Sequence, residues 1–123
     1  MIDGDTIKIA GGEIVRYIGI DAPETVDSKK PEECYGKEAS RHNKELVEGK
    51  MVWLEKDITN RDRYHRLLRY VWVGDMLVNA ELVKKGFAYS YLYPPDIKYQ
   101  DIFMKVQQEA QSAMRGLWST CSY

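Results

Sequence analysis

The sequence places two aspartates, Asp5 and Asp21, at the same end of a predicted β-hairpin. Asp5 lies near the start of the first strand and Asp21 ends the second, and antiparallel pairing brings those two points together. Carboxylates that converge beside backbone carbonyl groups suit a hard cation such as Ca²⁺ or Mg²⁺. The same residues also allow a simpler interpretation, in which Asp5 pairs with Arg16 and Asp21 only starts a turn.

A glycine pair at residues 11–12 is predicted to form the two-residue turn of this hairpin. In that register Ile7 faces Arg16, and Asp5 faces Ile18. The alternation of the strands then puts Asp5 and Arg16 on one otherwise apolar face, as diagonal neighbours. Charges on an apolar face are unfavourable unless they are paired or bind something. The pattern therefore indicates either an ion pair or a ligand site.

A second candidate group is the segment Arg63-Tyr64-His65-Arg66, which precedes a predicted strand. The planar guanidinium group of arginine matches the oxygen atoms of a phosphate. Two such groups near a carboxylate-bound cation would form a site for a phosphodiester. Arginines at the start of a strand are also common on protein surfaces, and we interpret His65 as solvated rather than as a general acid.

Three tyrosines, Tyr89, Tyr91 and Tyr93, alternate along an extended segment. Alternate residues of a strand share one face, so these rings could stack on the bases of a nucleic acid. A half-buried strand edge that is rich in tyrosine explains the same pattern, and the residues alone do not choose between the two.

Short strands and three helices must position these groups. A period of two predicts the strands, and an apolar stripe predicts the helices. The expected strands are 2–9, 14–21, 51–57, 67–73 and 76–78, with an extended segment at 87–91. The expected helices are 37–48, 80–85 after an Asn79 cap, and a long one from an Asp96 cap to Arg115. This order indicates an α+β fold, with the strands closed into a small barrel.

The composition fits one globular domain over residues 1–123. No apolar run approaches the ~18 residues that a membrane-spanning helix needs. With 18 basic and 19 acidic side chains the net charge is −1, which excludes the strongly basic surface of many nucleic-acid-binding proteins. Residues 1–25 hold five acidic and two basic side chains, whereas residues 61–69 hold four arginines and one aspartate. This distribution would allow a metal and a polyanion to bind side by side, but on charge counts alone two solvated faces explain it as well.

The two cysteines, Cys34 and Cys121, lie far apart and lack metal-ligand spacing. They are either separate thiols or one disulfide, which would contribute roughly 4 kcal/mol in the chain-entropy model. A disulfide would indicate an oxidising compartment or the cytosol of a thermophile. We expect a secreted or extracytoplasmic location, although residues 1–5 contain neither the basic nor the apolar segment of a signal peptide.

Taken in order along the chain, these motifs resemble the staphylococcal nuclease (thermonuclease) family. The resemblance extends over residues 2–118, which is nearly the whole chain. The matching segments are Asp3–Thr6, Val15–Thr25, Tyr35–Ser40, Asp62–Val71, Val78–Val83 and Gly116–Trp118. The segments are long and collinear, so the resemblance is specific.

The resemblance implies an OB-fold, a five-stranded β-barrel with three α-helices, of which the first strand is truncated in this chain. It implies a calcium-dependent nuclease that acts on single- and double-stranded DNA and on RNA and leaves 3′-phosphate ends. We expect a monomer that does not associate with membranes. The alternative is a catalytically inactive module of the same fold that binds nucleic acid or protein.

The resemblance also implies a role for each site residue. The implied ligands of Ca²⁺ are Asp5, Asp21 and the carbonyl group of Ala22. Arg16 and Arg66 would hold the scissile phosphate, and Glu24 would orient or deprotonate the attacking water. The implied contacts to the terminal phosphate and base are Arg63, Tyr64, Tyr91 and Tyr93.

Two residues depart from the family pattern. Ala22 stands where the family has a threonine, which matters little if only its carbonyl group binds the metal. His65 replaces the glycine that is usual before Arg66, which leaves the conformation of that loop open. The full set of implied catalytic residues is nevertheless present, and this favours the enzyme over the inactive module.

Overall fold

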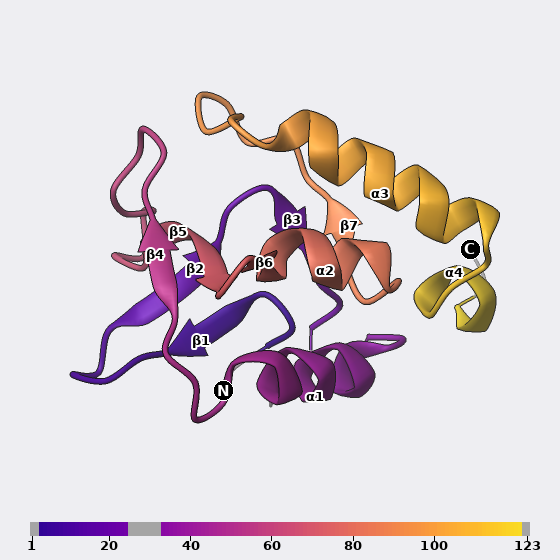
Figure 1. Ribbon diagram of the computed structural model, residues 1–123, viewed down its shortest axis with the longest axis horizontal. Coiled ribbons are helices and arrows are strands. Elements are labelled where there is room, and N and C mark those ends of the chain that lie inside the picture. Colours follow the sequence, from indigo (N-terminus) through magenta and orange to yellow (C-terminus); the bar gives the residue numbers. More distant parts are fainter. Residues whose placement is uncertain (1–2, 25–32, 122–123) are drawn as a thin grey trace.

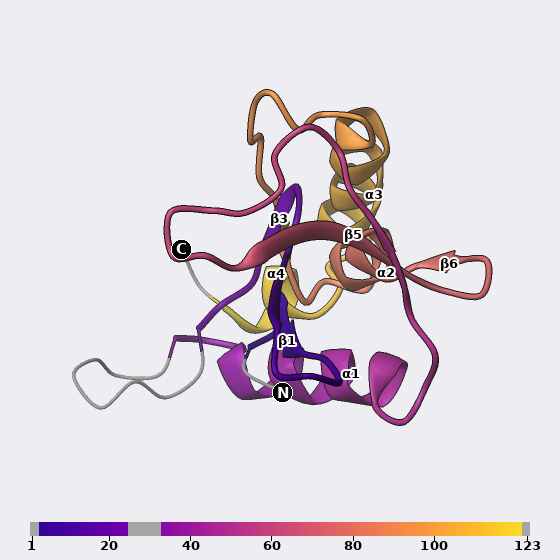
Figure 2. The same cartoon turned by 90° about the vertical axis from the view of Figure 1, so that its left-hand side faces the viewer.

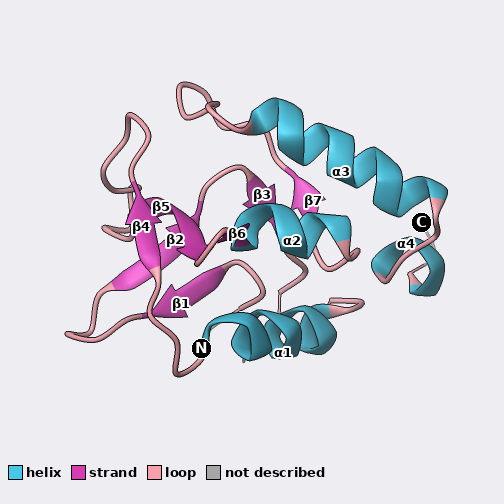
Figure 3. Ribbon diagram, in the orientation of Figure 1, coloured by secondary structure: helices cyan, strands magenta, loops and turns pink. Residues whose placement is uncertain are grey.

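The computed structural model describes residues 3–24 and 33–121 and confirms the expected α+β fold (Figure 3). Its strands are β1 (Thr6–Lys8), β2 (Ile14–Tyr17), β3 (Ile20–Asp21), β4 (Trp53–Glu55), β5 (Leu67–Val73), β6 (Met76–Leu77) and β7 (Tyr89–Ser90). Its helices are α1 (Gly36–Val47), α2 (Val78–Lys84), α3 (Gln100–Ser112) and α4 (Leu117–Thr120). The predicted strand 67–73 coincides with β5, and the predicted helix 37–48 is displaced from α1 by a single residue.

One mixed sheet runs in the order β1-β2-β5-β4, with β6 paired to β5. β2 and β5 pair in parallel, and the other neighbours pair antiparallel. β3 and β7 form a separate two-stranded ladder. Within the described residues no ladder joins β1 to β4, so the strands form an open sheet and not the closed barrel that the sequence predicts. The reason is the short β1, whose three residues pair only with β2.

The β1–β2 hairpin turns through a three-residue loop, one residue longer than the predicted glycine pair. The N–H of Ile9 donates to the carbonyl of Glu13 at 3.0 Å, which closes that loop. Ile7 consequently pairs with Val15 instead of Arg16, so the predicted register is wrong by one residue. Because a slip of one residue exchanges the two faces of a strand, Arg16 does not share the buried face of Ile7.

A turn before β1 explains why the predicted first strand begins only at Thr6. The backbone groups of Asp3 and Thr6 hydrogen-bond to each other at 3.3 and 3.4 Å. Gly4 lies within this turn and packs so tightly that a Cβ there would be 2.7 Å from the Cβ of Ala39 in α1. Only glycine allows this approach, and the turn carries the next side chain, Asp5, out of the strand.

Helix α2 lies between α1 and α3 in Figure 1, and Figure 2 shows α1 and α3 on opposite sides of the strands. The apolar core fills the space between these layers. Its fully buried members include Val15, Tyr17, Ile20, Tyr70, Val71, Val78, Leu82, Val83 and Phe103. No helix in the described part of the chain is both long and apolar enough to cross a membrane.

Asn79 does not cap α2 as the sequence predicts, but lies inside the helix with a fully buried side chain. Its Oδ1 accepts a hydrogen bond from the N–H of Val71 in β5 at 2.9 Å. Its Nδ2 donates to the carbonyl of Ile18, in the bend between β2 and β3, at 2.9 Å. Asn79 therefore satisfies two backbone groups that would otherwise be buried without partners.

Asp96 is not a helix cap either, because α3 begins only at Gln100. The buried Oδ1 of Asp96 accepts hydrogen bonds from the backbone N–H groups of Ile58 at 2.9 Å and Thr59 at 2.7 Å. The carboxylate thus fastens the loop after β4 to the segment before α3.

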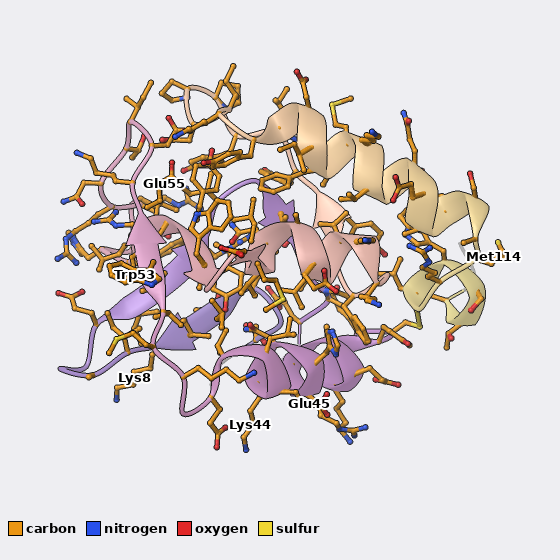
Figure 4. The ribbon with its side chains drawn as sticks, in the orientation of Figure 1. Lys8, Lys44, Glu45, Trp53, Glu55 and Met114 are labelled. Atoms are coloured by element: carbon orange, nitrogen blue, oxygen red, sulfur yellow. A yellow bond between two sulfur atoms is a disulfide. The ribbon has the colours of Figure 1, made fainter. Side chains whose placement is uncertain are left out.

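Glu55 of β4, labelled in Figure 4, makes a second connection to the start of α3. Its carboxylate accepts hydrogen bonds from the hydroxyl of Tyr99 and the indole N–H of Trp72, both at 2.9 Å, and pairs with Lys98. Together with Asp96, Glu55 holds residues 96–99 against the sheet.

Replacing Asn79 with alanine tests its role in the core. The Asn79→Ala variant leaves the Val71 N–H and the Ile18 carbonyl unpaired, and each unpaired buried group costs about 1–3 kcal/mol. We expect the free energy of unfolding, measured by urea denaturation, to fall by about 2–5 kcal/mol. Lys84→Ala, at an exposed position of the same helix, is the control and should change it by less than about 0.5 kcal/mol. Equal stabilities for the two variants would contradict this account.

Candidate active site

An open pocket of about 480 Å³ gathers most of the predicted site residues. Its walls come from the bend between β2 and β3, from the loop before β5 and from the segment after β7. The predicted residues that line it are Arg16, Asp21, Arg63, Tyr64, Arg66, Tyr91 and Tyr93. Among the described residues, the predicted site members that do not line it are Asp5, Ala22 and Glu24.

Asp5 lies behind this pocket with 6% of its surface exposed. Its Oδ1 accepts a hydrogen bond from the hydroxyl of Thr6 at 2.9 Å, and its Oδ2 accepts one from the N–H of Ala22 at 2.8 Å. Oδ2 also lies 3.4 Å from Nη2 of Arg16. These contacts fasten the turn before β1 to the residue that follows β3.

Arg16 bridges the two aspartates. Its Nη2 lies 3.4 Å from Oδ2 of Asp5 and 3.4 Å from Oδ1 of Asp21. Its Nη1 donates to the carbonyl groups of Tyr17 at 2.7 Å and Ile20 at 2.9 Å, so the β2–β3 bend wraps around the guanidinium group. The structure therefore contains both features that the sequence left as alternatives, an Asp5–Arg16 ion pair and two converging carboxylates.

The surroundings of Asp21 favour a bound cation. Burial raises the pKa of Asp21, the neighbouring carboxylate of Asp5 raises it further, and Arg16 offsets only part of this effect. Like charges that share one site are stabilised by an added positive charge. Because 54% of the Asp21 side chain is exposed, a cation from solvent can reach it.

The oxygen atoms at this point fit a hard divalent cation. In residues 3–24 and 33–121 no three His, Cys, Asp or Glu side chains gather closely enough to hold a metal by themselves. A cation at Asp5 and Asp21 would therefore also need the carbonyl of Ala22 and several water molecules. Calcium accepts such mixed sets, with about 6–8 oxygen ligands in flexible geometry.

Asp62 organises the loop that carries the second arginine. Its Oδ1 accepts hydrogen bonds from the N–H groups of Tyr64 and Arg66, both at 2.9 Å, and its Oδ2 accepts one from Nε of Arg66 at 2.7 Å. Burial alone would raise the pKa of Asp62, but the hydrogen bonds from Arg66 and Tyr64 outweigh it and hold the pKa below its usual value. Sequence reasoning missed this residue, although an aspartate that begins a polar turn is a known signal for such a structure.

His65, at the position where the resemblance implies a glycine, adopts the left-handed conformation, with a φ of 67°. That conformation costs a residue other than glycine about 1–2 kcal/mol. The N–H of His65 donates to the carbonyl of Asp62 at 3.0 Å, and its carbonyl accepts from Arg61 at 2.9 Å. The loop thus keeps a backbone that suits glycine. The His65 side chain is exposed and does not line the pocket, which agrees with the interpretation that it is solvated.

Arg66 presents its terminal nitrogens to the pocket region. Only its Nε is bonded, to Asp62, and within the described residues its two terminal nitrogens have no hydrogen-bond partner. Nη2 of Arg63 donates to the hydroxyl of Tyr64 at 2.8 Å. The guanidinium carbons of Arg63 and Arg66 lie 4.9 and 5.3 Å from the centre of the Tyr64 ring. Arg66 is therefore a cation that can meet a substrate anion without first losing a terminal contact.

The other arginines of the 61–69 cluster serve the scaffold. Arg61 donates to both carboxylate oxygens of Glu13 at 3.0 and 3.1 Å, which ties the loop to the β1–β2 hairpin. Arg69 donates to the side chain of Asn60 at 2.7 Å. Of the four arginines in this segment, Arg61 and Arg69 therefore stabilise the fold, and Arg63 and Arg66 line the pocket.

Two tyrosines form an exposed pair at the pocket. Tyr91 and Tyr93 keep 51% and 37% of their surface exposed, and their ring centres lie 6.4 Å apart. Tyr89 does not join them, because its ring packs edge-on against Trp118 at 5.4 Å. Only two of the three alternating tyrosines can therefore contact a base in the pocket.

Glu24 is exposed and lies at the end of the first described segment. Its charge contributes to the raised pKa of Asp21, so it lies near the carboxylate pair. Its carbonyl accepts a hydrogen bond from the N–H of Glu33 at 3.3 Å. The structure brings Glu24 to the neighbourhood of the predicted metal site but not into the lining of the pocket, and its catalytic role stays a prediction.

Comparison with known proteins identifies the family of this chain. Residues 14–120 match the family described as staphylococcal nuclease homologue. The thermonucleases of Staphylococcus intermedius and Staphylococcus hyicus are 43% and 42% identical to this chain, over 96% and 97% of its length and 72% of theirs. Endonuclease YncB of Bacillus subtilis (strain 168) is 45% identical over 99% of this chain and 60% of its own length. The family match and the two thermonucleases each cover most of the described structure, so the chain belongs to the staphylococcal nuclease family.

Proposed function

We propose that this chain is a calcium-dependent nuclease that hydrolyses phosphodiester bonds in single- and double-stranded DNA and in RNA. The observation that carries the proposal is the pocket lined by Arg16, Asp21 and Arg66, in which Arg16 also contacts the buried Asp5 behind it and Arg66 offers its terminal nitrogens. The relatives support it, because they are named thermonuclease and endonuclease.

Charge is the main obstacle in this reaction, because the negative charge of a phosphodiester repels an attacking water and increases in the transition state. A bound Ca²⁺ would supply positive charge beside the phosphate oxygens. The Arg66 guanidinium meets the phosphate directly, whereas Arg16 has to exchange its contact with an aspartate for one with the phosphate. Such fixed positive groups act most strongly where charge develops.

Glu24 orients the attacking water and takes one of its protons. The water oxygen forms a bond to phosphorus in line with the leaving 5′ oxygen, the P–O5′ bond breaks, and the 5′ oxygen takes a proton from solvent. The product strand then ends in a 3′-phosphate. Tyr64, Tyr91 and Tyr93, with Arg63, hold the neighbouring base and phosphate.

The protein works as a monomer outside the cytoplasm in this proposal. The disulfide between Cys34 and Cys121 supports that location, because such bonds persist in oxidising compartments. The alternative, an inactive module that only binds nucleic acid or protein, uses the exposed tyrosines without the carboxylates.

Substitution of Glu24 by glutamine tests its role as the base. Glu24→Gln keeps the shape of an exposed side chain and removes its charge, so the fold should be unchanged while kcat on single-stranded DNA falls by about 10²–10⁴-fold. Glu109→Gln, on the exposed side of α3, removes the same charge elsewhere and should leave kcat unchanged. Full activity in the Glu24 variant would remove this residue from the mechanism.

Metal removal tests the two-aspartate site. A chelator should abolish the cleavage of single-stranded DNA, and added CaCl₂ should restore it, because the bound ion supplies the positive charge beside the phosphate oxygens in this proposal. End-group analysis should find 3′-phosphates. Mg²⁺ should restore much less activity, since it demands a stricter octahedral geometry. Full recovery with Mg²⁺ alone would show that the ligands are wrongly assigned.

Asp62 can be tested by comparing two substitutions. Asp62→Asn can still accept the two backbone N–H groups at Oδ1 but no longer accepts from Nε of Arg66, so we expect a slightly lower melting temperature and about 10-fold slower cleavage. Asp62→Ala should also lower the free energy of unfolding by about 1–3 kcal/mol. Wild-type cleavage by the asparagine variant would mean that Arg66 does not need this anchor.

A further inference from the structure

The disulfide joins the segment that follows Glu24 to the residue that follows α4. Cys34 and Cys121 are bonded, with a Cα–Cα distance of 5.9 Å and a sequence separation of 87. Cys34 lies ten positions after Glu24, and Cys121 follows α4. The sequence left open whether these cysteines were paired. Because they are, the segment that follows Glu24 is attached to the C-terminal helix α4.

On the Cys34 side, the chain is hydrogen-bonded back to Glu24. The N–H of Glu33, the residue before Cys34, donates to the carbonyl of Glu24 at 3.3 Å. The carbonyl of Glu33 in turn accepts from the N–H of Gly36, the first residue of α1, at 3.0 Å. The charge of Glu33 also contributes to the raised pKa of Asp21. Glu24 and Glu33 therefore lie together beside the carboxylate pair.

On the Cys121 side, the chain is anchored by a close backbone crossing. A Cβ on Gly86 would lie 2.3 Å from the carbonyl oxygen of Arg115, and one on Gly116 would lie 2.4 Å from the carbonyl oxygen of Gly86. The N–H of Leu117, a fully buried residue, donates to Gly86 at 2.9 Å. Figure 1 shows α4 near the end of α2, where this crossing occurs. The anchor thus has little freedom to move.

The segment that precedes Glu24 is held by a different contact. Two residues before it, the N–H of Ala22 is held by the buried carboxylate of Asp5 at 2.8 Å. Glu24 therefore lies between one fixed point at Ala22 and another at Glu33. Within the described residues, the hydrogen bond that joins Glu24 to Glu33 is 3.3 Å long, and the disulfide fixes the next residue, Cys34.

We propose that the Cys34–Cys121 disulfide is a positioning element for Glu24, so that breaking it lowers the turnover of the enzyme while the protein stays folded. The proposal rests on the proposed function, in which Glu24 orients the attacking water and takes one of its protons. The arginines and tyrosines that bind substrate lie on other segments, so KM should change little. Misplacement of a catalytic group by about 1 Å can reduce the rate by up to about 10²-fold, and we expect a loss of about 10-fold in kcat.

The first test compares oxidised protein, reduced protein and the Cys34→Ser/Cys121→Ser double variant. A dithiol such as dithiothreitol donates two electrons: the S–S bond breaks, both cysteines become thiols, and the reductant becomes a cyclic disulfide. Kinetics on single-stranded DNA are measured with Ca²⁺, below the melting temperature of each form. Both forms without the bridge should lose about 10-fold in kcat at unchanged KM, and reoxidation by oxidised glutathione should restore the reduced protein. An unchanged kcat would overturn the proposal.

A double-mutant cycle separates positioning from general loss of stability. In the Glu24→Gln background the group to be positioned is absent, so removal of the bridge should no longer change the residual rate. An equal fold-loss in both backgrounds would mean that the bridge acts through stability alone. Leu82→Ala, which destabilises the buried core at α2 and, in the described part of the chain, removes no contact of Glu24 or of the disulfide, is the matched control and should keep the wild-type kcat.

A third comparison keeps the disulfide and so does not depend on folding without it. Glu33→Pro removes the N–H that donates to Glu24, whereas Glu33→Ala removes the same charge and keeps that N–H. Only the proline variant should lose kcat, and equal rates would contradict the proposal. If Glu24→Gln is fully active, the proposed function of Glu24 fails; if it is impaired while the bridge and Glu33 variants keep full kcat, only this inference fails.

Discussion

The buried carboxylate of Asp5 is the group on which the arrangement of the pocket depends. It accepts hydrogen bonds from Thr6 and Ala22 and lies 3.4 Å from Arg16, so it joins the turn before β1 to both sides of the β2–β3 bend. A buried carboxylate without such partners is strongly unfavourable. The fold stabilises this charge with hydrogen bonds and one guanidinium group, and it leaves the more exposed Asp21 beside it as a second negative charge.

The two arginines of the pocket differ in what they can offer a substrate. Arg16 is engaged with two carbonyl groups and two carboxylates, so it serves first as the counter-ion of the aspartates. Arg66 is held at Nε by Asp62, which fixes its direction and leaves its terminal nitrogens for another anion. An anion in the pocket can therefore contact the terminal nitrogens of Arg66 at once, whereas Arg16 must first give up a contact with an aspartate. This difference follows from geometry and is invisible in a count of charges.

The sequence predicted the elements that depend on local pattern and failed where distant contacts decide. The apolar run of β5 and the amphipathic stripe of α1 were located within one residue. The hairpin register failed because Ala10 joins the glycine pair in a three-residue loop, which the hydrogen bond from Ile9 to Glu13 closes. Asn79 and Asp96 carry the residue types of helix caps, but both are buried and bond to backbone groups from other segments. Likewise, the resemblance assigns a role to Arg66, whereas the hydrogen bond by which Asp62 holds Arg66 depends on the folded loop.

The most direct test of calcium binding at Asp5 and Asp21 is to grow crystals with CaCl₂ and to locate the ion by anomalous diffraction. The account predicts one ion at about 2.3–2.6 Å from oxygen atoms of Asp5, Asp21 and the Ala22 carbonyl group. An ion bound by neither aspartate, or a structure at saturating calcium in which Arg16 alone still bridges the two carboxylates, would contradict it.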